Sequence, residues 1–256
     1  MRWTGRRRIV QGSGLLLGLF GAFGIGMTHL IFPGLHCYAC PWAVTVCPVG
    51  LAQNLIVFGA PPFFLLGTLI AYGLLAGRGF CGWFCPFGTL NDLLSFRKVP
   101  IRKAFSYGKF AVLLGTLVAA WAFADTMFCK LCPAASLEAS IPYLINGVAE
   151  VNRPFLIHMG TLGATLIGMV LIARFWCRYL CPMGAILSLF NRVSFLHLRY
   201  APDLCTHCNQ CSAACPMGID PMEDHDDHNC IKCGACVDAC SLGSLTLRYG
   251  SKRDAS

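Results

Sequence analysis

Charged residues are scarce in this 256-residue sequence: Asp, Glu, Lys and Arg fill 12% of the positions, and hydrophobic residues fill 56%. So little charge excludes an ordinary soluble globular domain, in which about a quarter of the residues are charged. Acidic residues are the rarer kind, with 12 Asp and Glu against 20 Lys and Arg and a net charge of +8. The sequence also lacks a nucleophile constellation of the Ser, His and Asp kind, so no catalytic residue is predicted.

Cysteine, in contrast, is abundant, with 17 residues. Eight cysteines form two runs, C-T-H-C-N-Q-C-S-A-A-C-P from residue 205 and C-I-K-C-G-A-C-V-D-A-C-S from residue 230. This is the spacing of two-cluster ferredoxins, in which the fourth cysteine of each run ligates the other cluster. Zinc and a disulfide framework are the alternatives. The spacing predicts two [4Fe–4S] clusters, held by Cys205, Cys208, Cys211 and Cys240 and by Cys230, Cys233, Cys236 and Cys215.

Long apolar stretches predict four membrane spans, because roughly 20 apolar residues cross a bilayer. They lie at about residues 9–32, 55–76, 110–128 and 154–173. Pro61 and Pro62 predict a kink or a break inside the second. In this topology 18 of the 20 Lys and Arg fall on one side. The positive-inside rule then predicts a multi-pass protein of the cytoplasmic (inner) membrane with both termini in the cytoplasm, in contact with membrane lipid and with no nucleic-acid partner.

An internal repeat links the remaining cysteines to these spans. One unit consists of a span, C-x-x-C-P, a second span and C-x-x-x-C-P-x-G, and the unit occurs twice. Parallel repeats bring equivalent motifs together on each face of the membrane. Four thiolates are the ligand set of one cluster, so one or two further [4Fe–4S] clusters are expected. The inner ligands would be Cys81, Cys85, Cys177 and Cys181, and the outer ligands Cys37, Cys40, Cys129 and Cys132.

Two questions about the outer cysteines stay open at this stage. Cys47 is the spare cysteine, yet Cys47-Pro48-Val49-Gly50 resembles the C-P-x-G endings, so Cys47 is an alternative ligand to Cys37 or Cys40. An oxidising compartment would also allow the disulfides Cys37–Cys40 and Cys129–Cys132. Between outer and inner clusters we expect a gap approaching the membrane core of about 30 Å, with a quinone, a haem or a partner subunit to bridge it.

Three histidines, His29, His36 and His158, fall near the outer ends of the first and fourth spans. Ionisable residues in a membrane mark functional sites, so these are candidates to bind a quinone or haem, or to accept a proton from quinol. A hydrogen bond to a neighbouring helix is the alternative. The acidic run Asp220–His228 joins the two ferredoxin motifs, and is either a solvated loop or a docking face for a redox partner.

The predicted fold is mostly α. Residues 1–195 form a four-helix transmembrane bundle built from a repeated two-span unit, and residues 196–256 form a small cytoplasmic α+β ferredoxin-like domain with two [4Fe–4S] clusters.

The motifs F-C-G-W-F-C-P-F-G and F-W-C-R-Y-L-C-P-M-G-A, followed by two ferredoxin motifs, resemble the NapH-type membrane ferredoxin family. Its relatives serve periplasmic nitrate reduction, methylamine utilisation and the regulation of nitrous-oxide reductase. The resemblance implies an integral quinol-oxidising or electron-relaying subunit with cytoplasmic clusters, working beside other redox subunits. Members of that family carry the C-x-x-x-C-P pairs found here at Cys81, Cys85, Cys177 and Cys181.

The function expected from the sequence is electron relay between quinol or an outer-face redox partner and a cytoplasmic redox partner. The chain would be a subunit of an oxidoreductase complex, such as a quinol dehydrogenase. The alternatives are a quinone-linked thiol–disulfide oxidoreductase, and a membrane ferredoxin acting in metalloenzyme assembly or redox sensing.

Overall fold

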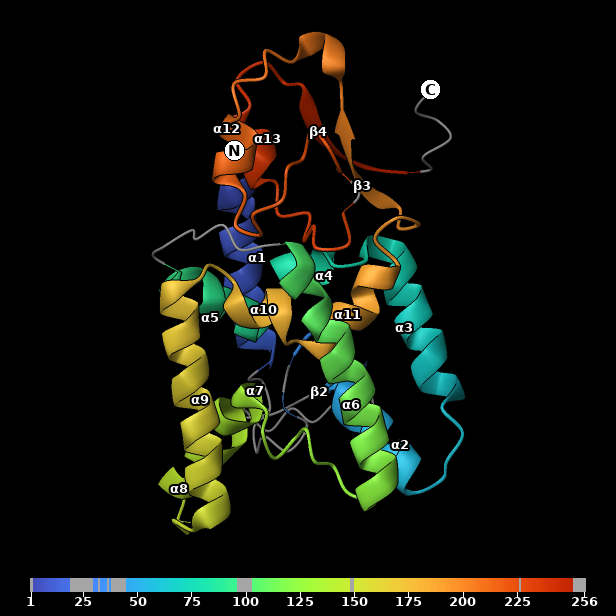
Figure 1. The fold of residues 1–256 in the computed structure, drawn as a ribbon, viewed down its shortest axis with the longest axis vertical. Helices are drawn as coiled ribbons and strands as arrows, with labels where there is room; N and C mark the ends of the chain where they lie inside the picture. Colours follow the sequence, from blue (N-terminus) through green and yellow to red (C-terminus); the bar gives the residue numbers. More distant parts are fainter. Residues whose placement is uncertain are drawn as a thin grey trace.

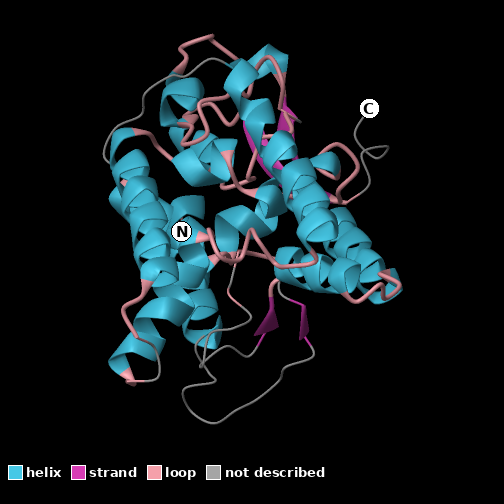
Figure 2. Ribbon diagram, turned by 60° about the horizontal axis from the view of Figure 1, so that its bottom comes forward, coloured by secondary structure: helices cyan, strands magenta, loops and turns pink. Residues whose placement is uncertain are grey.

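The computed structural model describes residues 2–18, 30–31, 33–35, 37, 45–95, 103–147, 150–225 and 227–250. Within these residues the chain is mostly helical, with two sheets of two short strands each (Figure 2). The longer helices are α1 (Trp3–Gly18), α2 (Pro48–Val57), α3 (Phe63–Ala76), α5 (Pro86–Leu94), α6 (Gly108–Phe123), α9 (Arg153–Leu171) and α11 (Pro182–Leu189). The shorter ones are α4 (Gly79–Trp83), η2 (Lys103–Tyr107), α7 (Pro133–Ala135), the π-helix η3 (Ser136–Ser140), α8 (Ile141–Ile145), α10 (Phe175–Tyr179), η4 (Pro202–Leu204), α12 (Gln210–Ala214) and α13 (Ala235–Ala239).

The repeat seen in the sequence is also a repeat of structure. The same succession of elements occurs twice, in α3, α4 and α5 and again in α9, α10 and α11. It consists of a long helix, a tight turn, a five-residue helix and a helix that begins at the proline of a Cys-Pro step. Helices α4 and α10 lie in the middle of the molecule, above α7 and β2 in the view of Figure 1. This arrangement places the two C-x-x-x-C-P motifs at the centre of the molecule.

The second predicted span, residues 55–76, is not one helix. Helix α2 ends at Val57, Gly59 follows with φ of 63°, and α3 begins at Phe63 after the two prolines. A proline ring clashes with the preceding turn and removes a hydrogen-bond donor, so paired prolines end a helix here. The break that the sequence predicted at the two prolines is confirmed.

The other spans agree to different degrees. Helix α9 matches residues 154–173 closely, and α6 ends at Phe123, before the predicted residue 128, because Ala124 is left-handed. In the described residues, two helical stretches, Phe105–Phe123 and Arg153–Leu171, are long and apolar enough to cross a membrane. The first span, 9–32, does not end as a helix, since strand β1 (Leu30–Ile31) pairs in parallel with β2 (Thr45–Val46); residues 19–29 lie outside the described part.

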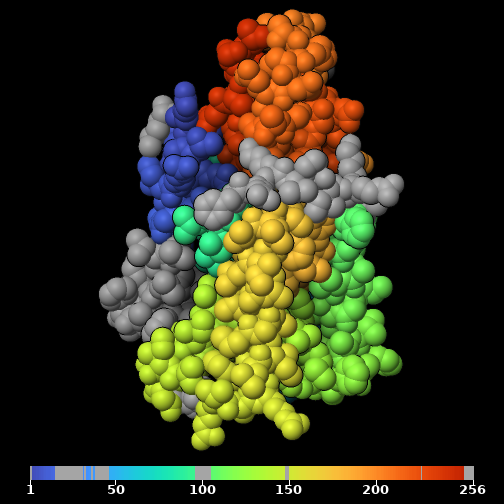
Figure 3. Space-filling model, turned by 60° about the vertical axis from the view of Figure 1, so that its left-hand side comes forward, coloured from blue at the N-terminus to red at the C-terminus, as the bar shows by residue number. Residues whose placement is uncertain are grey.

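The C-terminal segment packs on one end of the helices (Figures 1 and 3). Its strands β3 (Leu196–Tyr200) and β4 (Leu245–Tyr249) are antiparallel, with Leu198 opposite Leu247. Helix α1 is joined to this segment at its first turn, because the Asp238 carboxylate accepts hydrogen bonds from the backbone N–H groups of Trp3 (2.8 Å) and Thr4 (2.7 Å). A carboxylate at a helix N-terminus satisfies unpaired donors, so Asp238 caps α1 from a distant part of the chain.

Candidate iron–sulfur sites

Four Cys-Pro steps share one backbone geometry. Cys47, Cys85, Cys132 and Cys181 each lie directly before a helix in extended conformation, with φ from −65° to −74° and ψ from 112° to 124°. The following proline excludes a helical conformation at the cysteine and starts the helix with a preset φ. The thiols therefore lie at helix N-termini, where unpaired N–H groups favour negative charge, and the Gly184 N–H donates to the Cys181 sulfur at 3.3 Å.

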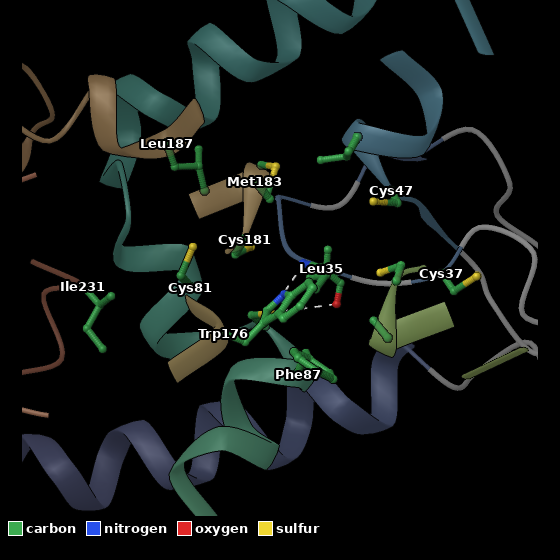
Figure 4. Close-up of a cluster of buried hydrophobic side chains, with 14 of the residues drawn as sticks. Leu35, Cys37, Cys47, Cys81, Phe87, Trp176, Cys181, Met183, Leu187 and Ile231 are labelled. Carbon is green, nitrogen blue, oxygen red and sulfur yellow. Dashed lines mark hydrogen bonds between the residues drawn. The ribbon is translucent and has the colours of Figure 1, made fainter. Parts of the chain in front are cut away.

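The inner group, Cys81, Cys85, Cys177 and Cys181, is brought together as the repeat predicts. The four thiols are 5–6% exposed and line a partly enclosed cavity, whose empty volume of about 280 Å³ includes the solvent space at its opening. The hydrophobic side chains of Leu35, Phe87, Trp176 and Met183 complete its wall (Figure 4). In the described part of the chain, no three His, Cys, Asp or Glu side chains lie close enough together to bind a single metal ion. The four thiols are therefore spaced around the cavity instead of converging on one ion.

Two arginines cross between the repeats beside this cavity. Arg78 precedes α4 and donates from Nη2 to the carbonyl of Cys177 at 2.6 Å, while Arg174 precedes α10 and donates from Nη1 to the carbonyl of Cys81 at 3.1 Å. Both side chains are fully buried. The sequence reasoning missed this pair, although an arginine three residues before the first cysteine of each motif was a visible signal.

The glycines of the two C-P-x-G motifs are required by the same packing. A Cβ added at Gly88 would lie 2.6 Å from the carbonyl oxygen of Cys81, and one added at Gly184 would lie 3.0 Å from Arg78 Nη2. Both contacts are tighter than an ordinary van der Waals contact. The motif therefore needs glycine where the Cys81 carbonyl and the Arg78 side chain approach the helix.

Unpartnered donors test whether an iron–sulfur cluster fits the inner cavity. Among the described residues, the buried Nε of Arg78 and Nε1 of Trp176 have no hydrogen-bond partner, and both side chains line the cavity. The Leu35 N–H donates to the Cys85 sulfur at 3.4 Å. Buried donors without acceptors are costly, and the sulfur atoms of a cluster accept such hydrogen bonds. The donor set and the thiols fit a [4Fe–4S] cluster.

The proximal ferredoxin group consists of Cys215, Cys230, Cys233 and Cys236. Its cysteines line a second, partly enclosed cavity, whose empty volume of about 390 Å³ includes the solvent space at its opening. Burial raises the pKa of Cys230 to about 12 and also raises the pKa of Cys215. Thiols buried in this way hold their protons until a metal displaces them, so iron binding and deprotonation are coupled here.

The distal ferredoxin group, Cys205, Cys208, Cys211 and Cys240, is less buried, and Cys208 is exposed. The backbone N–H of Ala201 donates to the carbonyl of Ser244 at 2.8 Å, which places the segment before Cys205 beside the segment after Cys240. A hydrogen bond to Cys205 raises the pKa of Tyr200 to about 12, and the Ser244 hydroxyl lies 3.0 Å from the Cys240 sulfur. The crossed ligand pattern expected from the spacing is compatible with this proximity.

The outer group is defined here as Cys37, Cys47, Cys129 and Cys132. The thiols of Cys47, Cys129 and Cys132 lie close enough to interact electrostatically, and Cys129 and Cys132 carry free thiols rather than a mutual disulfide. Cys37 is held nearby, since its backbone N–H donates to Glu138 Oε2 at 2.6 Å. Cys47 therefore lies in the outer group itself. Cys40, His29 and His36 fall outside the described residues.

His158 lies on α9, at the edge of an open groove whose wall includes Met127, Tyr143 and Phe155. Its Nδ1 is 2.8 Å from the Ser140 hydroxyl, which is the neighbouring-helix hydrogen bond that the sequence allowed. Its buried Nε2 has no hydrogen-bond partner among the described residues. One ring nitrogen is thus held in place, and the other is available to a ligand.

Leu35 connects the outer group to the inner group. Its N–H contacts the Cys85 sulfur at 3.4 Å, and Cys37 follows only two residues later. Because an extended residue spans at most about 3.6 Å, the Cys85 sulfur lies within roughly 12 Å of the Cys37 backbone. Figure 4 shows Leu35 between the labelled cysteines of the two groups. This distance between one cysteine of each group is far smaller than the 30 Å gap that the sequence led us to expect.

The inner group also contacts the C-terminal segment. The Trp83 indole donates to the carbonyl of Lys232 at 2.9 Å, and a Cβ at Gly82 would lie 2.5 Å from the carbonyl oxygen of Ile231. Ile231 and Lys232 lie between two cysteines of the proximal ferredoxin group. Gly82 ends a G-x-G-x-x-G spacing that begins at Gly77, but this spacing follows a helix instead of a strand, so it marks close packing and not a dinucleotide loop.

Comparisons with known proteins agree with these groups. A family model described as a 4Fe-4S binding domain matches residues 58–104 and 156–199, and a 4Fe-4S dicluster domain matches residues 197–241. The first model covers both C-x-x-x-C-P motifs. The second confirms [4Fe–4S] clusters in the C-terminal region. No solved structure matches the chain.

Three relatives illustrate the similarity. An uncharacterised protein of Methanocaldococcus jannaschii is 30% identical over 196 residues, covering 72% of this chain and 69% of that protein. The putative electron transport protein YccM of Escherichia coli is 27% identical over 220 residues, covering 77% of this chain and 58% of YccM. The ferredoxin-type protein NapH of Haemophilus influenzae is 27% identical over 199 residues, covering 69% of this chain and 65% of NapH. Proteins named NirI, MauN and NosR match as well, and the chain belongs to the NapH-type membrane ferredoxin family.

Proposed function

We propose that this protein relays electrons through the membrane along four cysteine groups, in the order outer, inner, proximal ferredoxin and distal ferredoxin. The observation that supports this order is that the inner group contacts both of its neighbours: Leu35 leads to the outer group, and Gly82 and Trp83 lead to the proximal ferredoxin group. Each group would hold one [4Fe–4S] cluster, which supplies one-electron redox chemistry when bound.

The protein's own part in this relay is to hold the groups close together and to exclude water between them. Three of the four inner thiols, Cys81, Cys85 and Cys181, belong to one continuous cluster of buried side chains that also includes part of the outer and proximal ferredoxin groups. Arg78 and Arg174 fix the two C-x-x-x-C-P motifs to each other, and Asn191 fixes the proximal group by donating to the carbonyl of Cys230 at 2.7 Å. A rigid, dry path of this kind needs no haem or partner subunit to bridge the outer and inner groups.

The proposed setting is the cytoplasmic membrane, with four spans in residues 1–195, the ferredoxin domain in residues 196–256 and both termini in the cytoplasm. Large apolar side chains on α3, α6 and α9 are more than 60% exposed, and soluble proteins rarely leave such surfaces open. They are Phe63, Phe64, Leu114, Trp121, Phe123 and Ile167. These outward faces support contact with lipid.

The electron donor in this proposal is quinol or a redox subunit on the outer face, and the acceptor is a cytoplasmic redox partner beside the distal ferredoxin group. The groove beside His158 supports a quinol donor, because its wall is mostly apolar and the unpartnered Nε2 can take a proton. The exposure of Cys208 supports the distal group as the point of electron exit.

A variant at the contact between the inner and proximal groups tests the relay. In Gly82→Val the Cβ collides with the Ile231 carbonyl oxygen, whereas a Cβ at Gly115 on α6 meets no atom within 4 Å, so Gly115→Val serves as the matched control. Each protein, reconstituted in vesicles, is mixed with a short-chain quinol, and cluster reduction is followed by freeze-quench EPR. We expect reduction of the ferredoxin clusters to be slowed in Gly82→Val and unchanged in Gly115→Val. Equal rates in Gly82→Val and the wild type would overturn the proposed path.

A further inference from the structure

Two buried cations beside the inner group have no ion-pair partner among the residues that the structure describes. Arg78 and Lys109 are both 0% exposed. Among the described residues, neither makes a salt bridge to a carboxylate. Taking a charge out of water without an opposite charge is very costly, so a stable fold needs a source of negative charge here.

The contacts of the two side chains are neutral. Lys109 Nζ donates to Asn229 Oδ1 at 2.7 Å, and Arg78 Nη1 donates to the same oxygen at 3.1 Å. Asp227 attracts Lys109 only at longer range, and its Oδ1 already accepts the Asn229 N–H at 2.6 Å. One amide oxygen thus serves both cations, and it carries no charge that offsets theirs.

The equivalent arginine of the second repeat, Arg174, has a carboxylate partner. Arg174 Nε donates to Asp92 Oδ1 at 2.7 Å, and a salt bridge joins the same two side chains. Arg78 and Arg174 occupy matching positions and make matching contacts to cysteine carbonyls. Within the described part of the chain, Arg174 has a carboxylate partner and Arg78 has none. The positively charged Arg78 side chain lines the cavity that contains the four inner thiols.

We propose that Arg78 and Lys109 form a buried cation pair that raises the reduction potential of the cluster in the inner group. This inference rests on the proposed function, since it requires a cluster there. A reduced cluster with four thiolate ligands carries one more negative charge than the oxidised cluster, so nearby fixed positive charge stabilises the reduced form. The step takes one electron from the outer group and passes it to the proximal ferredoxin group. No proton moves in this step. Burial lowers the pKa of Lys109 to about 6, and the negative charge of the Cys81 and Cys181 thiolates opposes that shift and favours the charged lysine.

The test is the midpoint potential of the inner cluster in the full-length protein, measured by EPR-monitored titration. The inner signal is the one that disappears in Cys85→Ser. Lys109→Met removes one charge, keeps the length of the side chain and touches no cysteine. We expect the equilibrium constant for reduction of the inner cluster to fall by at least about tenfold in this variant, which lowers the midpoint potential by about 59 mV for a one-electron couple. Arg78→Gln should lower the potential in the same direction, while Arg78→Lys should keep it close to the wild type.

Two controls separate charge from structure. Lys130→Met removes an exposed lysine that pairs with Asp125, and it should leave the potential unchanged. The double variant Arg174→Gln, Asp92→Asn removes one positive and one negative charge beside the same cavity, and its shift should be much smaller than that of Lys109→Met. If Lys109→Met behaves like Lys130→Met, the inference is overturned, even where Arg78→Gln fails to assemble. A wild type without any inner signal overturns the proposed function and this inference with it.

Discussion

Asp92 is a carboxylate that holds the first helix and both repeats together, so its replacement by asparagine should strongly destabilise the fold. Its oxygens pair with Arg7 of α1 and with Arg174 of the second repeat, and they accept a hydrogen bond from Gln11 at 2.9 Å. Arg174 is 0% exposed and Asp92 is 25% exposed at the side chain. Removing one partner of a buried ion pair costs 3–5 kcal/mol, and the partial exposure of Asp92 places the expected loss near the lower end, at about 3 kcal/mol.

The assay is thermal unfolding of the cluster-loaded protein in detergent, followed by tryptophan fluorescence. A loss of about 3 kcal/mol lowers the unfolding midpoint by roughly 6–12 °C in a chain of this size. Asp125→Asn is the matched control, because Asp125 forms an exposed salt bridge with Lys130 and exposed pairs contribute little. A midpoint for Asp92→Asn that stays within 2 °C of the Asp125→Asn midpoint would refute the central role of Asp92 (about 0.5–1 kcal/mol at most).

Three further changes test separate parts of the structure. Gly88→Ala places a Cβ 2.6 Å from the Cys81 carbonyl oxygen, so it should lower the free energy of unfolding by about 1–3 kcal/mol and loosen the inner cluster. Iron should then be released faster to a chelator. Gly163→Ala has open space around its Cβ and should not change the rate of iron release. His158→Ala should slow reduction by quinol while leaving iron content and reduction by dithionite unchanged; equal quinol rates would remove His158 from the donor site. Burial alone would raise the pKa of Asp238, but the hydrogen bonds from Thr4 and Trp3 outweigh burial and lower the pKa. The stabilisation of α1 by this carboxylate is therefore complete above the ordinary carboxyl pKa and is lost as the pH falls through the lowered pKa. Hydrogen exchange at the Trp3 and Thr4 amides should therefore be faster in Asp238→Asn at neutral pH, and an unchanged exchange rate would show that the cap contributes nothing.

Local spacing explains why part of the architecture was predictable. Ligands two residues apart and the Cys-Pro steps act within one turn of chain, so the ferredoxin runs and the break at Pro61 and Pro62 could be predicted without knowing what packs against them. The pairing of repeats could be predicted as well, because equivalent motifs meet about a symmetry axis.

Contacts between distant segments could not be predicted in the same way. Nothing near Arg78 in the sequence indicates that it reaches the carbonyl of Cys177, or that Asn229 lies beside it. Likewise, Leu35 belongs to a segment with no helical pattern, and only the fold places its N–H on the sulfur of Cys85. Cys37 and Cys85 lie closer together than the expected gap for this reason, since that expectation assumed that each motif stays at its own face of the membrane.

The central claim is that four groups of cysteines each hold a cluster, and iron with acid-labile sulfide per chain tests it most directly. Protein purified without oxygen should contain about 16 irons, four for each [4Fe–4S] cluster. Cys47→Ser, Cys132→Ser should reduce this to about 12, and so should Cys85→Ser, Cys181→Ser, while the two pairs combined should leave about eight. A wild type with about eight irons, unchanged by either pair, would contradict the relay and leave a two-cluster ferredoxin joined to a membrane anchor.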